Sequence, residues 1–137
     1  MTNKFNISIK DAWELLNTKH NSFLIDVRST AEWSIVGIPD LSSIKKNVRL
    51  IEWTSFPDGI YNSNFINELS NIGKTSDFFI FICRSGARSL SACYKAYENG
   101  YTNVYNLNDG FEGPLSKINQ RSQVKGWKHS NLPWYQN

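Results

Sequence analysis

The apolar run DFFIFI at residues 77–82 restricts the fold of this chain more than any other segment. Its last five residues are all apolar, so it lacks the alternation of a strand that has one face in water. Such a run is typical of a central strand in a parallel sheet, where helices cover both faces. The segment CRSGAR at 83–88 follows, and a helical pattern begins after it. A short loop therefore joins a buried strand to a helix.

Helical and strand patterns alternate along the rest of the chain. Helices are predicted at 6–17, at 62–73 and between the loop and Gly100, and a short helix or turn at 30–37. Strands are predicted at 22–28, 46–53, 77–82 and 102–107. This order predicts an α/β domain with a parallel central sheet flanked by helices. Ligands of such sheets bind at the carboxyl ends of the strands, which is where the loop at Cys83 lies.

Some of these predictions extend to single residues. Ser8 and Thr30 are the expected N-caps of the first two helices. In the strand at 46–53, Leu50 is expected on the face opposite Ile51. The helix after the loop is expected to bury an apolar stripe formed by Leu90, Cys93, Tyr94 and Tyr97.

Length and composition indicate one domain spanning 1–137, and the tryptophans of the segment at 114–137 are expected to pack back on it. The net charge of +3 comes from scattered lysines and arginines, which argues against nucleic acid as a partner. The N-terminus lacks the apolar segment of a signal peptide, and no apolar run is long enough to span a bilayer. A cytoplasmic location without membrane contact is the expectation.

The cysteine and histidine content indicates neither a disulfide nor a metal site. Cys83 and Cys93 are the two cysteines of a chain without a secretory signal, so a structural disulfide between them is not expected. His20 and His129 are the two histidines, and no CxxC or HxxxH spacing is present. No metal is predicted.

The loop after the central strand has the composition of an anion cradle. Gly86 allows a sharp curve that aims successive N–H groups inward, and the following helix adds the partial positive charge of its N-terminus. Cys83 would lie at the centre, where these groups and two guanidiniums, Arg84 and Arg88, are expected to lower its pKa. Ser85 and Ser89 add hydroxyl donors. Cys93, in contrast, is expected to be inert packing.

These residues resemble the rhodanese family, and specifically its single-domain members. The family's six-residue active-site loop begins with a cysteine between a central strand and a helix, and Cys83 to Arg88 match it in length and place. A second signature, DVR followed by an acidic and aromatic pair, stands at Asp26 to Arg28 and at Glu32-Trp33. A third, a late strand with a glycine turn, stands at 103–113. The match covers about residues 8–113.

The resemblance implies a five-stranded parallel sheet and a sulfurtransferase that works through a persulfide on Cys83, without cofactor or metal. A small anionic donor such as thiosulfate would supply the sulfur, and cyanide, a thiol or a protein thiol would accept it. The substrate-binding residues would be Arg84, Ser85, Gly86, Ala87, Arg88 and Ser89. Asp26 and Arg28 are interpreted as structural, with an internal ion pair such as Arg28 to Glu32.

The chain departs from the family in two places and leaves two other functions open. The stretch after Trp33 reads VGIPDLSS and lacks the family's usual histidine and Gly-Ala, and the segment at 45–63 is long. A phosphatase or arsenate reductase of the same fold would carry arginine six positions after the cysteine, where Ser89 stands. A non-catalytic interaction domain or a persulfide carrier is the other alternative.

Overall fold

A five-stranded parallel sheet forms the centre of the molecule. The computed structural model describes residues 4–55, 57–114 and 125–136. The strands are β1 (Asn6–Ile7), β2 (Ser22–Asp26), β4 (Arg49–Leu50), β5 (Phe78–Ile82) and β6 (Asn103–Leu107), and they pair in the order β1-β6-β5-β2-β4. The predicted α/β fold and its parallel sheet are therefore confirmed.

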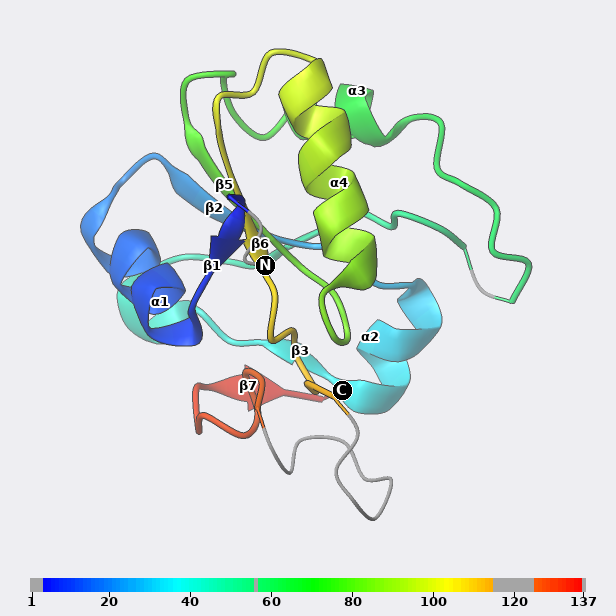
Figure 1. Ribbon diagram of the computed structural model, residues 1–137. Coiled ribbons are helices and arrows are strands. Elements are labelled where there is room, and N and C mark those ends of the chain that lie inside the picture. The colour runs from blue at the N-terminus through cyan, green and yellow to red at the C-terminus, as the bar shows by residue number, and fades with distance from the viewer. Residues whose placement is uncertain (1–3, 56, 115–124, 137) are drawn as a thin grey trace.

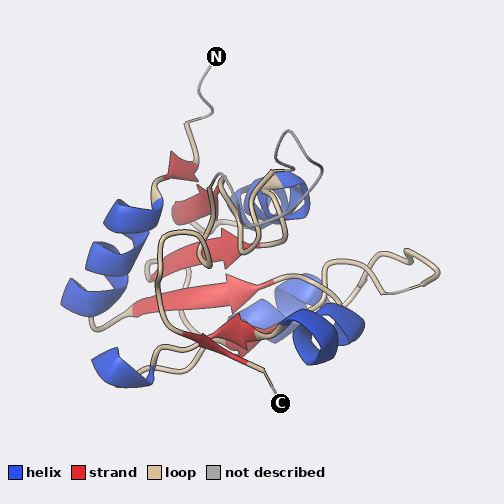
Figure 2. Cartoon of the chain, turned by 90° about the horizontal axis from the view of Figure 1, so that it is seen from below, coloured by secondary structure: helices blue, strands red, loops and turns tan. Residues whose placement is uncertain are grey.

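Helices cover the sheet on both faces. The helices are α1 (Ile9–Thr18), α2 (Thr30–Val36), α3 (Phe65–Ser70) and α4 (Ala87–Glu98), with a short 3-10 helix, η1 (Ser42–Ile44). α1 lies on one side of the sheet, and α3 and α4 lie on the other (Figures 1 and 2). The buried residues of α1 and those of α3 and α4 accordingly belong to two separate core clusters.

The unbroken apolar run of β5 supplies side chains to both clusters. Phe79 and Phe81 pack toward α3 and α4, whereas Ile80 and Ile82 pack toward α1. All four side chains are fully buried. Because side chains alternate between the faces of a strand, Cys83 continues the series of Phe79 and Phe81 and lies on the α4 side. The run thus places the cysteine beneath the start of α4.

Three local predictions are corrected by the structure. Ser29, rather than Thr30, caps α2, because its hydroxyl accepts from the N–H of Glu32 and the Glu32 carboxylate accepts from the Ser29 N–H. The strand predicted at 46–53 is shorter, because β4 spans only Arg49–Leu50. Leu50 is exposed and Ile51 is buried, so the two side chains point in opposite directions as predicted.

The third correction concerns α4, whose buried face is formed by small residues. Ser89, Ala92, Cys93 and Ala96 are buried, while Tyr94 and Tyr97 are about half exposed. The two tyrosines instead flank Phe5, with ring centroids 5.2 and 5.4 Å from its ring. Small side chains let α4 lie close to the sheet, and the aromatic rings then pack along its edge.

The C-terminal residues that are described lie against the carboxyl end of the sheet. β7 (Trp134–Tyr135) pairs antiparallel with β3 (Ile38–Pro39), and Trp127 is fully buried. The Trp127 backbone N–H donates to Gly110 O at 2.8 Å, and its indole N–H donates to Pro133 O at 2.7 Å. Residues 115–124 of the predicted extension lie outside the described residues.

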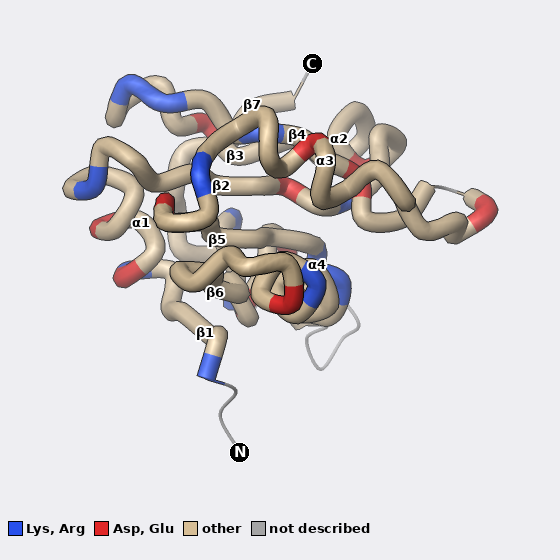
Figure 3. The backbone as a smooth tube through the Cα atoms, turned by 90° about the horizontal axis from the view of Figure 1, so that it is seen from above, with Lys and Arg blue, Asp and Glu red and all other residues tan. Residues whose placement is uncertain are grey.

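Lysine and arginine residues are spread over several separate segments (Figure 3).

Within the three described ranges, no helix is both long and apolar enough to cross a membrane.

Candidate functional site

Cys83 lies directly after β5, at the carboxyl end of the sheet's middle strand. Its side chain is 1% exposed, and two neighbouring segments fix its backbone. Phe111 donates its N–H to Cys83 O at 2.8 Å, and Val27 donates its N–H to Ile82 O at 2.9 Å. The cysteine is therefore held between the turns that follow β6 and β2.

Two polar groups contact the Cys83 sulfur. The Gly86 N–H donates to Sγ at 3.1 Å, and the Ser89 hydroxyl lies 3.3 Å from Sγ. Gly86 has a φ of 111°, which favours glycine and turns the backbone so that its N–H points back at the sulfur. The expected inward curve of the loop is thus present at Gly86.

α4 begins within the predicted loop, at Ala87. The first N–H groups of a helix have no partner within the helix, and the positive end of its dipole lies there. These amides follow Gly86, whose own N–H already contacts Sγ. The sulfur thus lies beside a helix N-terminus, where negative charge is stabilised.

The Ser89 hydroxyl belongs to a buried polar chain that extends to β1. Ser89 Oγ donates to Asn106 Oδ1 at 2.5 Å, and Asn106 Nδ2 donates to Asn6 Oδ1 at 3.0 Å. Ser89 and Asn106 are buried, with exposed fractions of 0% and 2%. Because the Asn106 amide is oriented by Asn6, its oxygen faces Ser89.

The turn after β6 packs tightly on the loop. Arg84 O accepts from the N–H groups of Glu112 and Gly113 at 3.0 and 3.1 Å. A Cβ atom at Gly110 would lie 2.3 Å from Arg84 O, and one at Gly86 would lie 2.5 Å from Asn108 O. Both glycines have positive φ, so the two backbones approach at positions where only glycine fits.

The two loop arginines have different surroundings. Arg84 is exposed, whereas Arg88 donates through Nη1 and Nη2 to the Glu32 carboxylate at 2.6 and 2.9 Å. Partial burial raises the pKa of Glu32, but the hydrogen bonds and charge of Arg88 outweigh this and lower it to about 2. The hydrogen bonds that Arg88 donates to Glu32 likewise raise the pKa of Arg88. Arg88 thus already has an anionic partner within the protein.

The expected pair between Arg28 and Glu32 is wrong. Arg28 is fully buried and pairs with Asp26, with Nη2 2.7 Å from Oδ2 and Nε 2.9 Å from Oδ1. It also donates to Gly37 O at 2.6 Å, and its guanidinium stacks 4.3 Å from the Phe111 ring centroid. These contacts join the turns after β2 and β6, in keeping with the structural role expected of Asp26 and Arg28.

Comparison with known proteins decides the family. The family described as the STR4 middle domain matches residues 5–137. Rhodanese-like domain-containing protein 4 of Arabidopsis thaliana, a chloroplastic protein, is 31% identical over 131 residues, which are 93% of this chain and 25% of that protein. The chain belongs to the rhodanese-like family.

Full-length relatives of this rhodanese-like chain occur in bacteria. The uncharacterized protein RP600 of Rickettsia prowazekii is 42% identical over 131 residues, covering 94% of this chain and 95% of the relative. The crystal structure of Rv0390 from M. tuberculosis superposes with a TM-score of 0.88 at 43% identity, covering 96% and 97% of the two chains. The polysulfide-sulfur transferase homodimer of Wolinella succinogenes shares the fold, with a TM-score of 0.63 at 24% identity over 96% of this chain and 77% of that one.

Cys93 packs in the hydrophobic core of this rhodanese-like domain. It is fully buried on the inner face of α4, in the same core cluster as Cys83. Burial strongly raises the pKa of the Cys93 thiol, and negative charge on Cys83 raises it further. Both cysteines are free thiols. A thiol in this environment stays protonated near neutral pH, as expected of inert packing.

The structure brings the predicted loop residues together and adds others that sequence reasoning missed. Gly86 and Ser89 contact the sulfur, while Arg84, Ser85 and Ala87 are exposed. Asn106 and Glu32 were not predicted as partners of the loop. The signal for Asn106 was present, because an amide at a buried position of a strand needs a hydrogen-bond partner. Glu32 gave no comparable signal, because its partner is 56 residues away.

A metal site is not suggested by the described residues. Within them, no group of three or more His, Cys, Asp or Glu side chains could hold a metal ion. A cavity of about 510 Å³ lies elsewhere, and Cys83 and residues 84–89 do not line it.

Proposed function

We propose that this rhodanese-like domain is a sulfurtransferase that carries sulfur as a persulfide on Cys83. The observation that carries the proposal is the placement of Cys83 Sγ, which accepts from the Gly86 N–H and lies beside the Ser89 hydroxyl at the N-terminus of α4. Donors of this kind stabilise a thiolate, which is the nucleophilic form of cysteine. Membership in the rhodanese-like family supports the same chemistry.

The reaction consists of two displacements. The Cys83 thiolate attacks the outer sulfur of thiosulfate, an S–S bond forms to Cys83, the S–S bond of thiosulfate breaks, and sulfite leaves with the bonding electrons. A thiolate acceptor or cyanide then attacks the outer sulfur of the persulfide and leaves Cys83 as a thiolate. Each step conserves charge and needs no redox partner. The anionic persulfide is stabilised by the amides at the start of α4.

Arg84 is the loop guanidinium proposed to attract an anionic donor. It is exposed, whereas Arg88 is held by Glu32. Arg84 to Ala is therefore expected to slow loading from thiosulfate more than Arg88 to Ala does. Arg88 to Ala is expected to act mainly on stability, because it leaves Glu32 half-buried without its partner.

The direct test is the mass of the intact protein after incubation with thiosulfate. We expect a gain of one sulfur atom that disappears on addition of cyanide. The variant Cys83→Ser should gain nothing, whereas Cys93→Ser, the matched control in the same core cluster, should load as the wild type does. Loading that survives in Cys83→Ser, or loading lost in Cys93→Ser, would contradict the assignment.

The same samples distinguish the rival functions. Hydrolysis of an aryl phosphate without sulfur loading would favour the phosphatase, although the position six residues after Cys83 is Ser89 rather than arginine. Loading without turnover to cyanide or thiols would indicate a persulfide carrier. An interaction domain would show neither reaction.

A further inference from the structure

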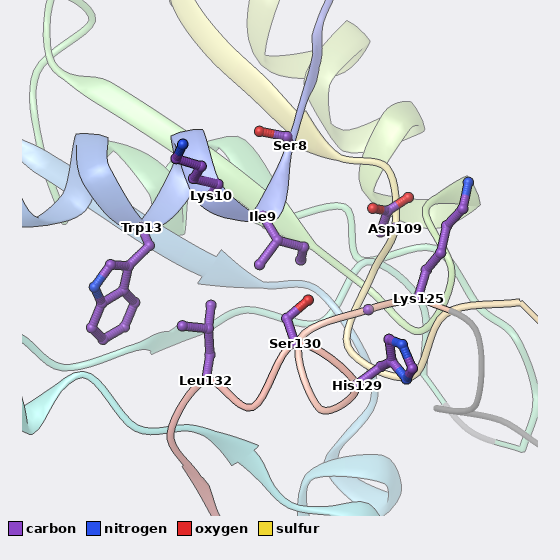
Figure 4. Close-up of a pocket in the computed structure, with 10 residues that line it drawn as sticks. Ser8, Ile9, Lys10, Trp13, Asp109, Lys125, His129, Ser130 and Leu132 are labelled. Atoms are coloured by element: carbon purple, nitrogen blue, oxygen red, sulfur yellow. The ribbon is translucent and has the colours of Figure 1, made fainter.

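An open cavity lies beside the turn that follows β6. The cavity has a volume of about 510 Å³ and is lined by the start of α1, by Asp109 and by residues of the C-terminal segment from Lys125 to Leu132 (Figure 4). Its volume falls in the range of about 300–1,000 Å³ that is usual for small-molecule sites. No step of the proposed sulfur transfer uses it.

The cavity has an apolar end and a charged end. Trp13 and Leu132 lie toward one end, and Asp109, Lys125 and His129 lie toward the other, with Ile9 and Ser130 between them (Figure 4). Small-molecule sites commonly combine apolar walls with a few polar groups that orient the ligand. A ligand that fits this arrangement has an apolar body and a charged head group.

Fixed backbone contacts form the walls. Trp127 donates its N–H to Gly110 O at 2.8 Å, and Ser130 donates its N–H to Gly126 O at 3.0 Å. The Trp13 ring packs edge-on against the buried Trp127 ring, with centroids 5.8 Å apart. These contacts hold the C-terminal segment against α1, so the cavity is preformed.

The lining charges favour an anion. Two lysines line the cavity against one carboxylate: Lys125 lies at the same end as Asp109, and Lys10 lies on the Trp13 side of Ile9 (Figure 4). We propose that this cavity binds a small organic acid with an aromatic or aliphatic body. The carboxylate lies toward Lys125, and the body packs against Trp13 and Leu132. The C-terminal segment thereby gains a role beyond stabilising the fold, since it supplies one wall of this site.

The binding test uses three ligands that share one body. 3-Phenylpropionate, 3-phenylpropanamide and 3-phenylpropylamine are titrated into the full chain while amide and indole N–H shifts are followed by NMR. We expect the acid to bind with a dissociation constant on the order of 1 mM, the amide more weakly, and the amine not at all. The perturbed signals should include Trp13, Ser130 and their neighbours rather than residues 84–89.

Variants separate the two ends of the cavity. Lys125→Gln is expected to weaken the binding of 3-phenylpropionate about threefold to tenfold and to leave the binding of 3-phenylpropanamide unchanged. Leu132→Ser is expected to weaken the binding of both ligands, because both pack their apolar body against this side chain. Lys74→Gln, an exposed lysine in the turn before β5, is the control and should change neither.

Three results would overturn the proposal: no saturable shifts at concentrations about tenfold above the expected constant, tighter binding of the amine than of the acid, or equal binding of the acid to wild type and Lys125→Gln. Sulfur loading of Cys83 is measured separately by mass. Failure of either proposal therefore leaves the other intact.

Discussion

Ser89 connects the sulfur of Cys83 to the polar interior of the fold. A hydroxyl has one proton, and Ser89 Oγ lies within reach of Gly86 O, Asn106 Oδ1 and Cys83 Sγ, at 3.1, 2.5 and 3.3 Å. When Cys83 is a thiol, its S–H can donate a hydrogen bond to Ser89 Oγ while the Ser89 hydroxyl donates to Asn106 Oδ1. When Cys83 is a thiolate, the same hydroxyl can rotate and donate to the sulfur. Ser89 can therefore form a hydrogen bond with Cys83 in both protonation states of the cysteine.

Ser89→Ala should slow alkylation of Cys83 by iodoacetamide at pH 7 by about tenfold. A hydrogen bond to a charged group contributes about 1.5–3 kcal/mol, and the variant also leaves Asn106 Oδ1 buried without its donor. Ser91→Ala is the matched control on the same helix, because Ser91 is exposed and its hydroxyl donates to Ala87 O. Equal alkylation rates in the two variants would show that Ser89 does not assist the thiolate.

Glu32→Gln should destabilise the protein at pH 7 by about 1–3 kcal/mol, allowing for the partial exposure of the pair. The pKa of Glu32 is lowered from 4.5 to about 2 in the folded state, so its carboxylate stabilises the fold at pH values above 4.5. That contribution is lost as the pH falls from 4.5 toward 2. Urea unfolding across this range should show the difference between variant and wild type shrinking, with exposed Glu14→Gln as the control. A difference that stays constant down to pH 2 would contradict the pairing.

At the scale of elements, Gly86 and Gly110 let the loop after β5 and the turn after β6 lie in close backbone contact. Gly59 offers a comparison for Gly110. Gly110 and Gly59 both have positive φ, at 72° and 67°, but their surroundings differ. A Cβ at Gly110 would meet the Arg84 backbone at 2.3 Å, whereas nothing lies within 4 Å of one at Gly59. Alanine substitutions at these two glycines therefore separate the free-energy cost of a positive φ from the cost of a steric clash.

Gly110→Ala should destabilise the fold by more than the about 1–3 kcal/mol of an unfavourable φ alone, and it should reduce sulfur loading of Cys83. Gly59→Ala should destabilise the fold only by the cost of its unfavourable φ. Sulfur loading of Cys83 should be as in the wild type. Chemical denaturation and intact mass measure the two effects. Equal destabilisation by both substitutions would mean that the backbone contact with Arg84 relaxes freely.

Elements with a strong local pattern could be predicted from the sequence, and those defined by distant contacts could not. The apolar run of β5 and the apolar spacing of α1 depend on period and burial alone, so both were found. β4 pairs over only two residues, so the alternating pattern at 46–53 did not show where the strand begins and ends. The partners of Arg28 and Arg88 were missed because ion pairs depend on how turns meet in space. Asn106 was missed because its role depends on the register of β6 beside β1.

At the scale of the whole molecule, the C-terminal segment completes the carboxyl end of the sheet. Its Trp127 is buried between α1 and the turn after β6, whose opposite side binds the carbonyls of Cys83 and Arg84. The same turn thus separates the cysteine from the cavity. A change at Trp127 should therefore reach both sites through one backbone segment.

Trp127→Ala should lower the free energy of unfolding by about 3–5 kcal/mol, because it removes a fully buried indole and leaves a cavity. Trp134→Ala is the matched control, since Trp134 is 40% exposed and should cost much less. In Trp127→Ala we also expect slower sulfur loading and weaker binding of 3-phenylpropionate, measured where the variant is still folded. The free energy of unfolding could fall while the rate of sulfur loading and the affinity for 3-phenylpropionate both stay at wild-type values. In that case the turn after β6 does not transmit the change. Trp127 would then stabilise the fold without positioning either site.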